Sequence, residues 1–227
     1  MLPRLPKAVI FDMDGLLIES ETLYRDSFLA ASREGGHGMH VETYQKVCGS
    51  PWDTITKAIL ADYGADFPID TFRDAWLKHL RIMMADGVAL KPGVIEILDL
   101  LDRFSIRRAI ATSSQHDSVQ RHLSPFDLPQ RFDQIVARGD YAAPKPSPLP
   151  YLTAAQRLDI DPVHCLALED SYHGVRSASA AGMMTIMVPD VAPPTEEMQD
   201  RCVAICDDLF SVASLLQKAH SGVFAGS

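Results

Sequence analysis

The chain has 227 residues, 47% of them hydrophobic, and a formal net charge of -9 at pH 7, which fits a globular protein of one or two domains with a sizeable core. The acidic balance disfavours nucleic acid and anionic membranes as main partners. Because no apolar run approaches the ~20 residues of a membrane span, and residues 1–7 lack the apolar segment of a signal peptide, we expect a cytoplasmic protein.

Strand-like and helix-like segments alternate along most of the chain. Strand-like apolar runs lie at 7–11, 108–112, 133–136, 165–168, 184–188 and 203–206. Helical patterns lie at 93–103, 115–123, 147–158, 172–181 and 208–218. In the first of these, Val94, Leu98 and Leu101 recur on one helix face. The alternation predicts an α/β fold with a mainly parallel sheet, in which ligands bind beyond the carboxyl ends of the strands.

The first strand ends in the run Asp12-Met13-Asp14-Gly15. Two carboxylates at i and i+2 form a compact anionic site, and carboxylate and carbonyl oxygens are the hard ligands that Mg2+ prefers. A carboxylate can also attack phosphorus to give an aspartyl-phosphate. The motif can therefore supply both a metal site and a nucleophile. The alternative is an ordinary acidic turn, in which Asp and Gly are common.

Residues 19–88 interrupt the alternation, because they show no convincing strand pattern. Helical stretches are predicted there at 20–34, 41–48, 53–63 and 70–85, with breaks at glycine and proline. The insertion begins just after Asp14 and returns to the sheet edge, so we expect it to be a helical cap over the site. The expected organisation is a core of residues 1–18 and 89–220, a cap of residues 19–88 and a flexible tail at 221–227.

Hydroxyl side chains follow the second strand, in the run Thr112-Ser113-Ser114. Hydroxyls and backbone N–H groups at a strand end, ahead of a helix, form a suitable cradle for phosphate oxygens. The same residues would also serve as an ordinary helix N-cap. The two roles can coexist.

Two further clusters carry charge. Lys145 stands between Pro144 and Pro146, and proline fixes the backbone on either side. A rigidly aimed ammonium suits an anionic transition state, whereas an ordinary solvated lysine is the alternative. A later apolar strand ends in Glu169-Asp170, a second acidic pair that can complete a metal site with Asp12 and Asp14.

These four clusters, in this order, resemble the haloacid dehalogenase superfamily of phosphatases over nearly the whole chain. The resemblance implies a Rossmann-like core with a helical cap inserted after the first motif. It implies that Asp12 is the nucleophile, Asp14 the general acid and base, and Lys145 the charge-stabilising group. It also implies that Thr112 binds phosphate and that Asp170 and Glu169 form the acidic pair of the metal site. With the hydroxyl run and the first acidic pair described above, the predicted phosphate ligands are Thr112, Ser113 and Ser114, and the predicted Mg2+ ligands are Asp12, Asp14, Glu169 and Asp170.

The activity implied by the resemblance is the Mg2+-dependent hydrolysis of a small phosphate monoester through an aspartyl-phosphate. The runs 11–17, 111–114 and 180–183 look like the branch that contains β-phosphoglucomutase, phosphoglycolate phosphatase and the pseudouridine-monophosphate phosphatases. Together with the run 187–190, they look closest to the last group. The expected partner is a small phosphorylated metabolite such as a sugar phosphate or a nucleotide. We expect the protein to be a monomer.

The chain departs from this branch in the insertion. Tyr24 stands where the β-phosphoglucomutases place a histidine, and Trp52 stands where their phosphate-gripping arginine aligns. Both departures count against a mutase, and the flat faces of Tyr24 and Trp52 suit a sugar or base ring. The alternative for Trp52 is that it simply packs between helices of the insertion. Leu149 replaces the aspartate that often ends the lysine motif. The alternatives that remain are a phosphosugar mutase, a dehalogenase, which the second carboxylate Asp14 disfavours, and a non-catalytic phosphometabolite-binding protein.

Overall fold

The computed structural model describes residues 2–48, 50, 52–85 and 87–224. The chain divides into two compact units. We call Met1–Ile18 with Leu90–Ser227 the core unit, and Glu19–Ala89 the helical insertion. Within the described ranges, no helix combines the length and the apolar character that crossing a membrane requires.

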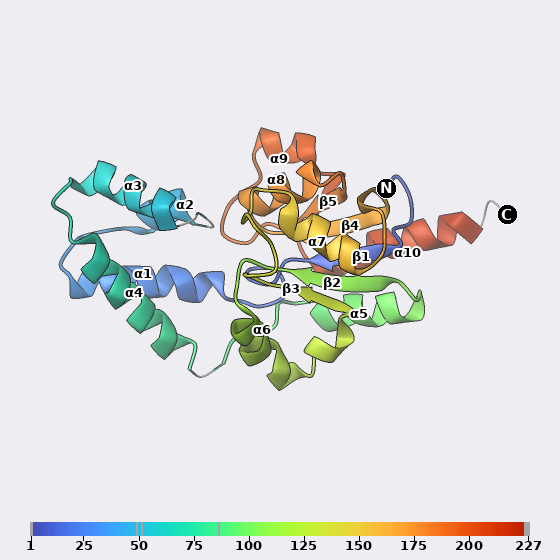
Figure 1. Ribbon diagram of the computed structural model, residues 1–227, viewed down its shortest axis with the longest axis horizontal. Helices are drawn as coiled ribbons and strands as arrows, with labels where there is room; N and C mark the ends of the chain where they lie inside the picture. Colours follow the sequence, from blue (N-terminus) through green and yellow to red (C-terminus); the bar gives the residue numbers. More distant parts are fainter. Residues whose placement is uncertain (1, 49, 51, 86, 225–227) are drawn as a thin grey trace. The chain divides into compact units, whose positions relative to one another are not determined.

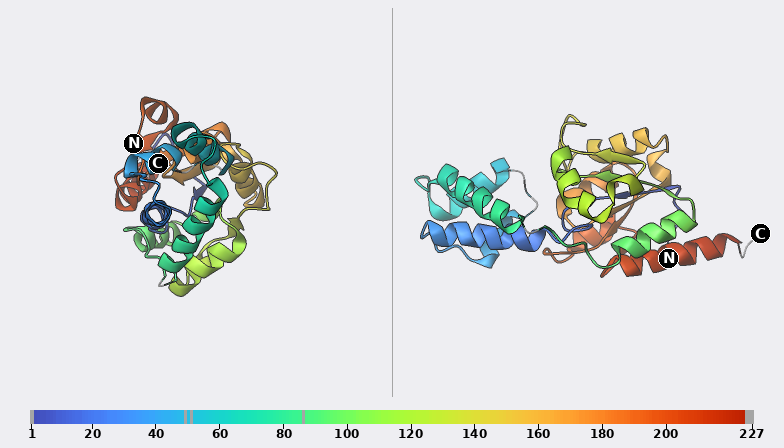
Figure 2. Two further views of the ribbon diagram at one scale, coloured as in Figure 1. Left: turned by 90° about the vertical axis from the view of Figure 1, so that its left-hand side faces the viewer. Right: turned by 90° about the horizontal axis from the view of Figure 1, so that it is seen from below.

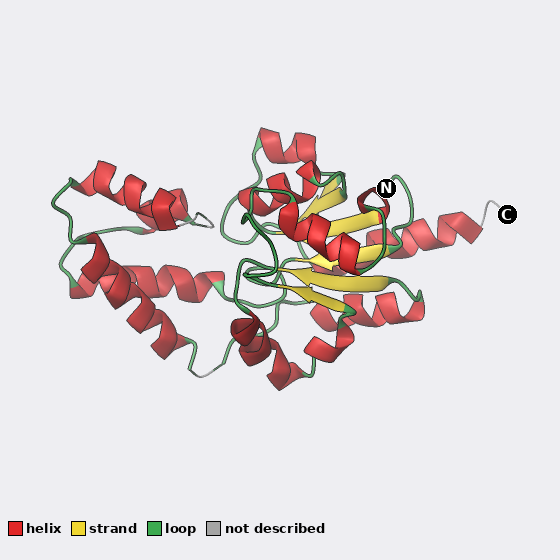
Figure 3. Cartoon of the chain, viewed as in Figure 1, coloured by secondary structure: helices red, strands yellow, loops and turns green. Residues whose placement is uncertain are grey.

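The core unit is built on a six-stranded sheet in the order β3-β2-β1-β4-β5-β6, and every neighbouring pair is parallel (Figure 3). The strands are β1 (Ala8–Phe11), β2 (Arg107–Ala111), β3 (Gln134–Val136), β4 (Cys165–Glu169), β5 (Met184–Met187) and β6 (Ala204–Ile205). Each lies within one residue of its predicted segment at both ends, so the predicted α/β fold with a mainly parallel sheet is confirmed. Every residue of β1 and β4 is buried, as expected for central strands that are covered on both faces.

Helices cover both faces of the sheet. α7 (Leu149–Arg157) and α8 (Tyr172–Ala180) lie on one face, and α5 (Val94–Arg103) and α10 (Leu209–Phe224) pack side by side on the other (Figures 1 and 2). The apolar face predicted for α5 is buried. Among the described residues of the core unit, the other helices of four or more residues are α6 (His116–Leu123) and α9 (Glu196–Arg201).

Two C-terminal features differ from the expectations. α9 was not predicted, because it has only six residues and begins at a Thr195 cap rather than in an apolar pattern. We expected a flexible tail at 221–227, but α10 continues through Phe224. Residues 225–227 of that tail lie outside the described residues.

The order of the strands places a topological switch point between β1 and β4. The chain runs outward from β1 through β2 to β3, and then returns to the other side of β1 as β4. The connections that leave β1 and β4 therefore diverge at their carboxyl ends, and ligands of parallel sheets bind at this kind of switch point. Asp12 follows β1 directly, and Glu169 is the last residue of β4.

The helical insertion contains α1 (Glu21–Glu34), α2 (Val41–Val47), α3 (Trp52–Tyr63) and α4 (Ile69–Met83). Aromatic rings fill its interior. Phe28 on α1 makes edge-to-face contacts with Phe72 and Trp76 at 5.1 Å between ring centroids, and with Tyr44 at 5.5 Å. Such contacts add to the stabilisation from burial alone. The four helices agree with the predicted ones to within two residues at each end.

Candidate active site

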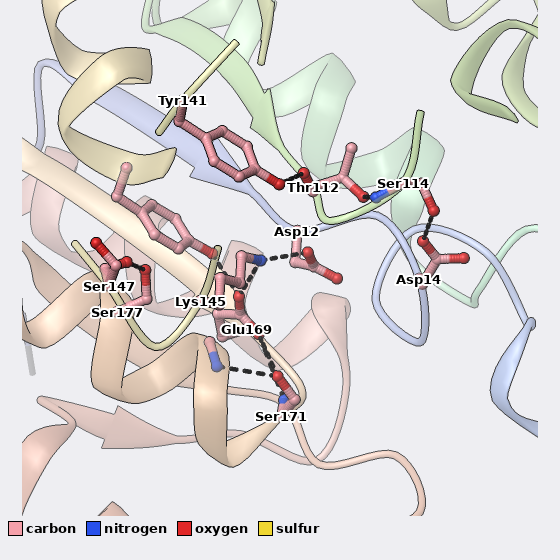
Figure 4. Close-up of polar contacts among 12 residues, drawn as sticks. Asp12, Asp14, Thr112, Ser114, Tyr141, Lys145, Ser147, Glu169, Ser171 and Ser177 are labelled. Atoms are coloured by element: carbon pink, nitrogen blue, oxygen red, sulfur yellow. Dashed lines mark hydrogen bonds and ion pairs between the residues drawn. The ribbon is translucent and has the colours of Figure 1, made fainter. Parts of the chain in front are cut away.

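Asp12 and Lys145 lie in direct contact beyond the end of β1 (Figure 4). The Nζ of Lys145 donates to Asp12 Oδ1 and to Glu169 Oε1, at 2.5 Å in each case. All three side chains are buried. The core thus joins one ammonium to two carboxylates that come from two adjacent strands.

The loop before α7 delivers Lys145 to this position. Pro144 and Pro146 flank it in the sequence and restrict the backbone. Ser177 on α8 donates from its hydroxyl to the carbonyl of Ser147, at 2.5 Å, and so fastens the loop (Figure 4). Burial lowers the pKa of Lys145, but the charges of its two carboxylate partners outweigh this effect and raise the pKa above its ordinary value. Lys145 is therefore a cation at neutral pH.

A cluster of carboxylates adjoins the lysine. Asp12, Glu169 and Asp170 are buried, and each offers one oxygen in a set whose members all lie within 4.8 Å of one another. Burial is the main reason that the pKa of Asp12 rises to about 8; the charge of Lys145 opposes this rise, and the charges of Glu169 and Asp14 add to it. A divalent cation bound beside Asp12, in addition to Lys145, would favour the ionised carboxylate. Acidic oxygens are the ligands that Mg2+ selects.

Glu169 is fixed at both of its carboxylate oxygens. Tyr151 donates from its hydroxyl to Oε1 at 2.7 Å, while the backbone N–H and the hydroxyl of Ser171 donate to Oε2 at 3.4 and 3.2 Å. Gly174 on α8 leaves room for the carboxylate, because a Cβ there would lie 1.9 Å from it. Sequence reasoning missed Tyr151, Ser171 and Gly174 in this role, since the motif alone does not indicate which groups surround Glu169.

Asp14 lies apart from this cluster, although the sequence assigns it to the same metal site. The chain turns directly after it at Gly15, whose φ of 81° is in the left-handed region that favours glycine. The half-buried carboxylate of Asp14 instead accepts a hydrogen bond from the Ser114 hydroxyl, at 2.7 Å (Figure 4). The acidic pair after β1 and the hydroxyl run after β2, which the sequence predicts to lie near each other, are therefore in contact.

The hydroxyl run after β2 does not cap the following helix. The N-cap of α6 is Gln115, which makes no capping bond through its side chain. Thr112 is buried, accepts the Ser114 N–H at its Oγ1 at 3.0 Å, and accepts the Tyr141 hydroxyl at its carbonyl at 2.9 Å. Ser113 accepts a bond from Arg138 at its carbonyl, at 3.1 Å. The turn is thus fixed next to Asp14, where phosphate-binding groups are predicted.

Tyr24 and Trp52 belong to the helical insertion rather than to the core unit. The carbonyl of Tyr24 accepts a bond from the indole N–H of Trp76 at 3.1 Å. Trp52 is half-buried, and its ring lies 6.3 Å from that of Trp76 between centroids. The guanidinium of Arg73 stands 4.7 Å from the Trp52 ring centroid. These contacts give Trp52 a packing role within the insertion.

Comparison with known proteins gives a family match. The sequence model of one protein family, the haloacid dehalogenase-like hydrolases, matches residues 9–188 of this chain. The chain is 32% identical over 221 residues to the protein CbbY of Cereibacter sphaeroides, covering 92% of this chain and 96% of that protein. It is 30% identical over 230 residues to hexitol phosphatase B of Escherichia coli (strain K12), covering 95% and 97%.

Solved structures give the same match at the level of the fold. A crystal structure of a CbbY mutant from Rhodobacter sphaeroides, in complex with xylulose-(1,5)bisphosphate, superposes with a TM-score of 0.72. The sequence identity is 28%, and the alignment covers 90% of this chain and 95% of the other. The match therefore includes most of both chains.

Proposed function

The chain belongs to the haloacid dehalogenase-like hydrolase family, and we propose that it is a phosphatase that hydrolyses a small phosphate monoester through an aspartyl-phosphate on Asp12. The contact between Asp12 and Lys145, beside the buried carboxylates of Glu169 and Asp170, carries this proposal. A carboxylate nucleophile needs a nearby cation to approach an anionic ester, because like charges repel. The site supplies both groups.

The first step transfers the phosphoryl group to the protein. An oxygen of Asp12 forms a bond to phosphorus while the bond from phosphorus to the ester oxygen breaks. Asp14, oriented by the Ser114 hydroxyl, gives its proton to the leaving alcohol. Lys145 offsets the negative charge that develops on the phosphoryl oxygens.

The second step releases inorganic phosphate. Asp14, now ionised, takes a proton from a water molecule, and the oxygen of that water attacks phosphorus while the bond from Asp12 to phosphorus breaks. Asp12 returns as a carboxylate and Asp14 as an acid. Each carboxyl group therefore begins and ends the cycle in the same state.

We propose Mg2+ as the cofactor, held by Asp12 and Asp170. Asp12, Glu169 and Asp170 are buried, and each offers one carboxylate oxygen in a set whose members all lie within 4.8 Å of one another. Clustered acidic oxygens of this kind are the ligands that Mg2+ selects. When bound, Mg2+ offsets the repulsion between the nucleophile and the phosphate. Glu169 was also predicted as a ligand, but its carboxylate already accepts four hydrogen bonds. We therefore propose that Glu169 mainly binds the ammonium of Lys145 rather than the metal.

The proposed substrate class is a phosphorylated sugar or sugar alcohol. Hexitol phosphatase B is named for such substrates, and the CbbY crystal holds a sugar bisphosphate; both relatives align with nearly all of this chain. Tyr24 and Trp52 are the proposed contacts to the leaving group. We further propose that the protein acts in the cytoplasm as a monomer.

A substrate screen tests this function. The purified protein is incubated with sugar phosphates, hexitol phosphates, nucleotides including pseudouridine monophosphate, and phosphoglycolate, first with Mg2+ and then with EDTA. We expect Mg2+-dependent release of inorganic phosphate, highest for a sugar or hexitol phosphate and absent for Asp12→Asn. A coupled sugar-phosphate isomerisation assay separates a mutase from a phosphatase. Phosphate release no greater than that of the Asp12→Asn variant for every compound would refute the proposal.

A further inference from the structure

Tyr151 is a buried polar group that the proposed mechanism leaves without a role. It is the third residue of α7, and it is among the largest side chains with no exposed surface. Its hydroxyl donates to Glu169 Oε1 at 2.7 Å. The same oxygen accepts a hydrogen bond from the Lys145 ammonium at 2.5 Å. The phenol and the ammonium therefore meet at a single carboxylate oxygen.

The ring of Tyr151 also adjoins the lysine. Lys145 Nζ lies 5.1 Å from the ring centroid, within the range in which a cation is attracted to an aromatic face. The ring belongs to a buried cluster that includes Ile10 of β1 and Ala167 of β4. Because this cluster is packed from both strands, Tyr151 has little freedom to move. The hydrogen bond from its hydroxyl therefore holds the Glu169 carboxylate in a fixed position.

The fixed carboxylate in turn determines where the ammonium lies. A lysine ammonium has three N–H donors. One points to Glu169 and one to Asp12, which leaves the third for an incoming phosphoryl oxygen. If Glu169 rotates, the bond from Lys145 to Glu169 bends, and the other two donors shift with it. Such a shift is costly in a site where an error of about 1 Å can lower the rate a hundredfold.

We propose that Tyr151 is a positioning residue that acts through Glu169 to hold Lys145 in its catalytic orientation. This inference rests on the proposed phosphatase function, and it adds a group that does not itself touch the substrate. It predicts that the Tyr151 hydroxyl affects turnover and leaves substrate binding nearly unchanged. A group that only fills the core would affect stability instead.

Tyr151→Phe tests this role, because the substitution keeps the ring and removes only the hydroxyl. Steady-state kinetics use p-nitrophenyl phosphate with saturating Mg2+, at a temperature at which circular dichroism shows every variant fully folded. Tyr63→Phe is the matched control, since it removes a tyrosine hydroxyl that bonds to Thr43 Oγ1 at 3.1 Å within the helical insertion. We expect Tyr151→Phe to lower kcat about tenfold with KM changed less than about twofold. Tyr63→Phe should match the wild type.

A second measurement does not depend on turnover. In lysine-selective 1H–15N NMR, the buried Lys145 ammonium should give a slowly exchanging signal, which is identified by its loss in Lys145→Arg. We expect this signal to shift or broaden in Tyr151→Phe and to stay unchanged in Tyr63→Phe. A wild type without phosphatase activity would count against the proposed function, whereas this signal would still report on Tyr151. An unaltered signal, an unaltered kcat, or a Tyr151→Phe protein that is unfolded at every temperature would overturn the inference.

Discussion

Lys145 Nζ lies 2.5 Å from Asp12 Oδ1, and both side chains are at most 9% exposed. The cation and the proposed nucleophile therefore form one buried unit rather than a surface ion pair. Removing one partner of a buried pair leaves the other charge without compensation, which costs about 3–5 kcal/mol. A surface pair contributes at most about 1 kcal/mol.

Lys145→Met should accordingly lower both activity and stability. We expect kcat to fall by at least about a hundredfold, the usual effect of removing one group that stabilises transition-state charge. With EDTA present, the free energy of unfolding should fall by about 3–5 kcal/mol. Lys46→Met is the control, since Lys46 forms an exposed pair with Asp62 at 2.7 Å. Similar losses in the two variants, measured by kinetics and urea unfolding, would contradict the assigned role of Lys145.

Divalent cations should control the activity. The clustered oxygens of Asp12 and Asp170 fit a small cation, and Mg2+ requires near-octahedral geometry, whereas the larger Ca2+ accepts more flexible coordination. We expect EDTA to abolish phosphate release, Mg2+ to restore it, and Ca2+ to inhibit the Mg2+-activated protein. Full activity after exhaustive chelation would rule out the proposed metal.

Stability should depend on pH through Asp140. Arg157 bonds to both oxygens of this carboxylate, at 2.9 and 3.1 Å, and is the main cause that lowers the pKa of Asp140 to about 2. Because the pKa is about 3.9 in an unfolded chain, the stabilisation is present above pH ~4 and is lost as the pH falls toward 2.

Asp140→Asn should therefore lower the free energy of unfolding by about 2 kcal/mol at pH 7, and by progressively less below pH ~4. Urea unfolding across this pH range measures the difference. Asp127→Asn is the control, since Asp127 is exposed. A difference between Asp140→Asn and the wild type that stays constant from pH 7 to pH 3 would show that the stabilisation does not depend on the charge.

Trp52→Ala tests the proposed contact with the leaving group. The contacts of Trp52 with Trp76 and Arg73 predict a lower Tm in any case. If Trp52 also binds substrate, kcat/KM for the best sugar phosphate should fall by about tenfold or more, and p-nitrophenyl phosphate should be much less affected. Equal losses on both compounds, together with the lower Tm, would identify Trp52 as purely structural.

The sequence predicted the sheet well because its signals are local. Buried runs such as Ala8–Phe11 are apolar and lie between breaks, and parallel strands alternate with helices at regular spacing. The family resemblance rests on three motifs at the ends of strands and on the lysine motif in the loop before α7, and the family match over residues 9–188 confirms it. The short helix α9 has too few residues to show a periodic pattern.

The contacts within the site could not be predicted in the same way. The bond between Ser114 and Asp14 joins residues that are 100 positions apart, and Tyr151 reaches Glu169 from a helix on one face of the sheet. Such contacts depend on helix rotation and on side-chain direction, which periodicity does not determine. The motifs indicated which groups carry the chemistry, but they did not indicate which neighbours hold those groups in place.

The most direct test of the account is to trap the phosphorylated protein. Wild-type protein turning over a good substrate with Mg2+ is quenched in acid, digested and analysed by mass spectrometry, with Asp12→Asn as the control. We predict a phosphoryl group on the peptide that contains Asp12, located on Asp12 by fragmentation, and its absence from the Asp12→Asn variant. Phosphate release without any phosphoryl group on Asp12 would contradict the assignment of Asp12 as the nucleophile. An Asp12→Asn variant that keeps more than a tenth of the wild-type kcat would contradict it too, because that loss corresponds to less than about 1.4 kcal/mol of transition-state stabilisation.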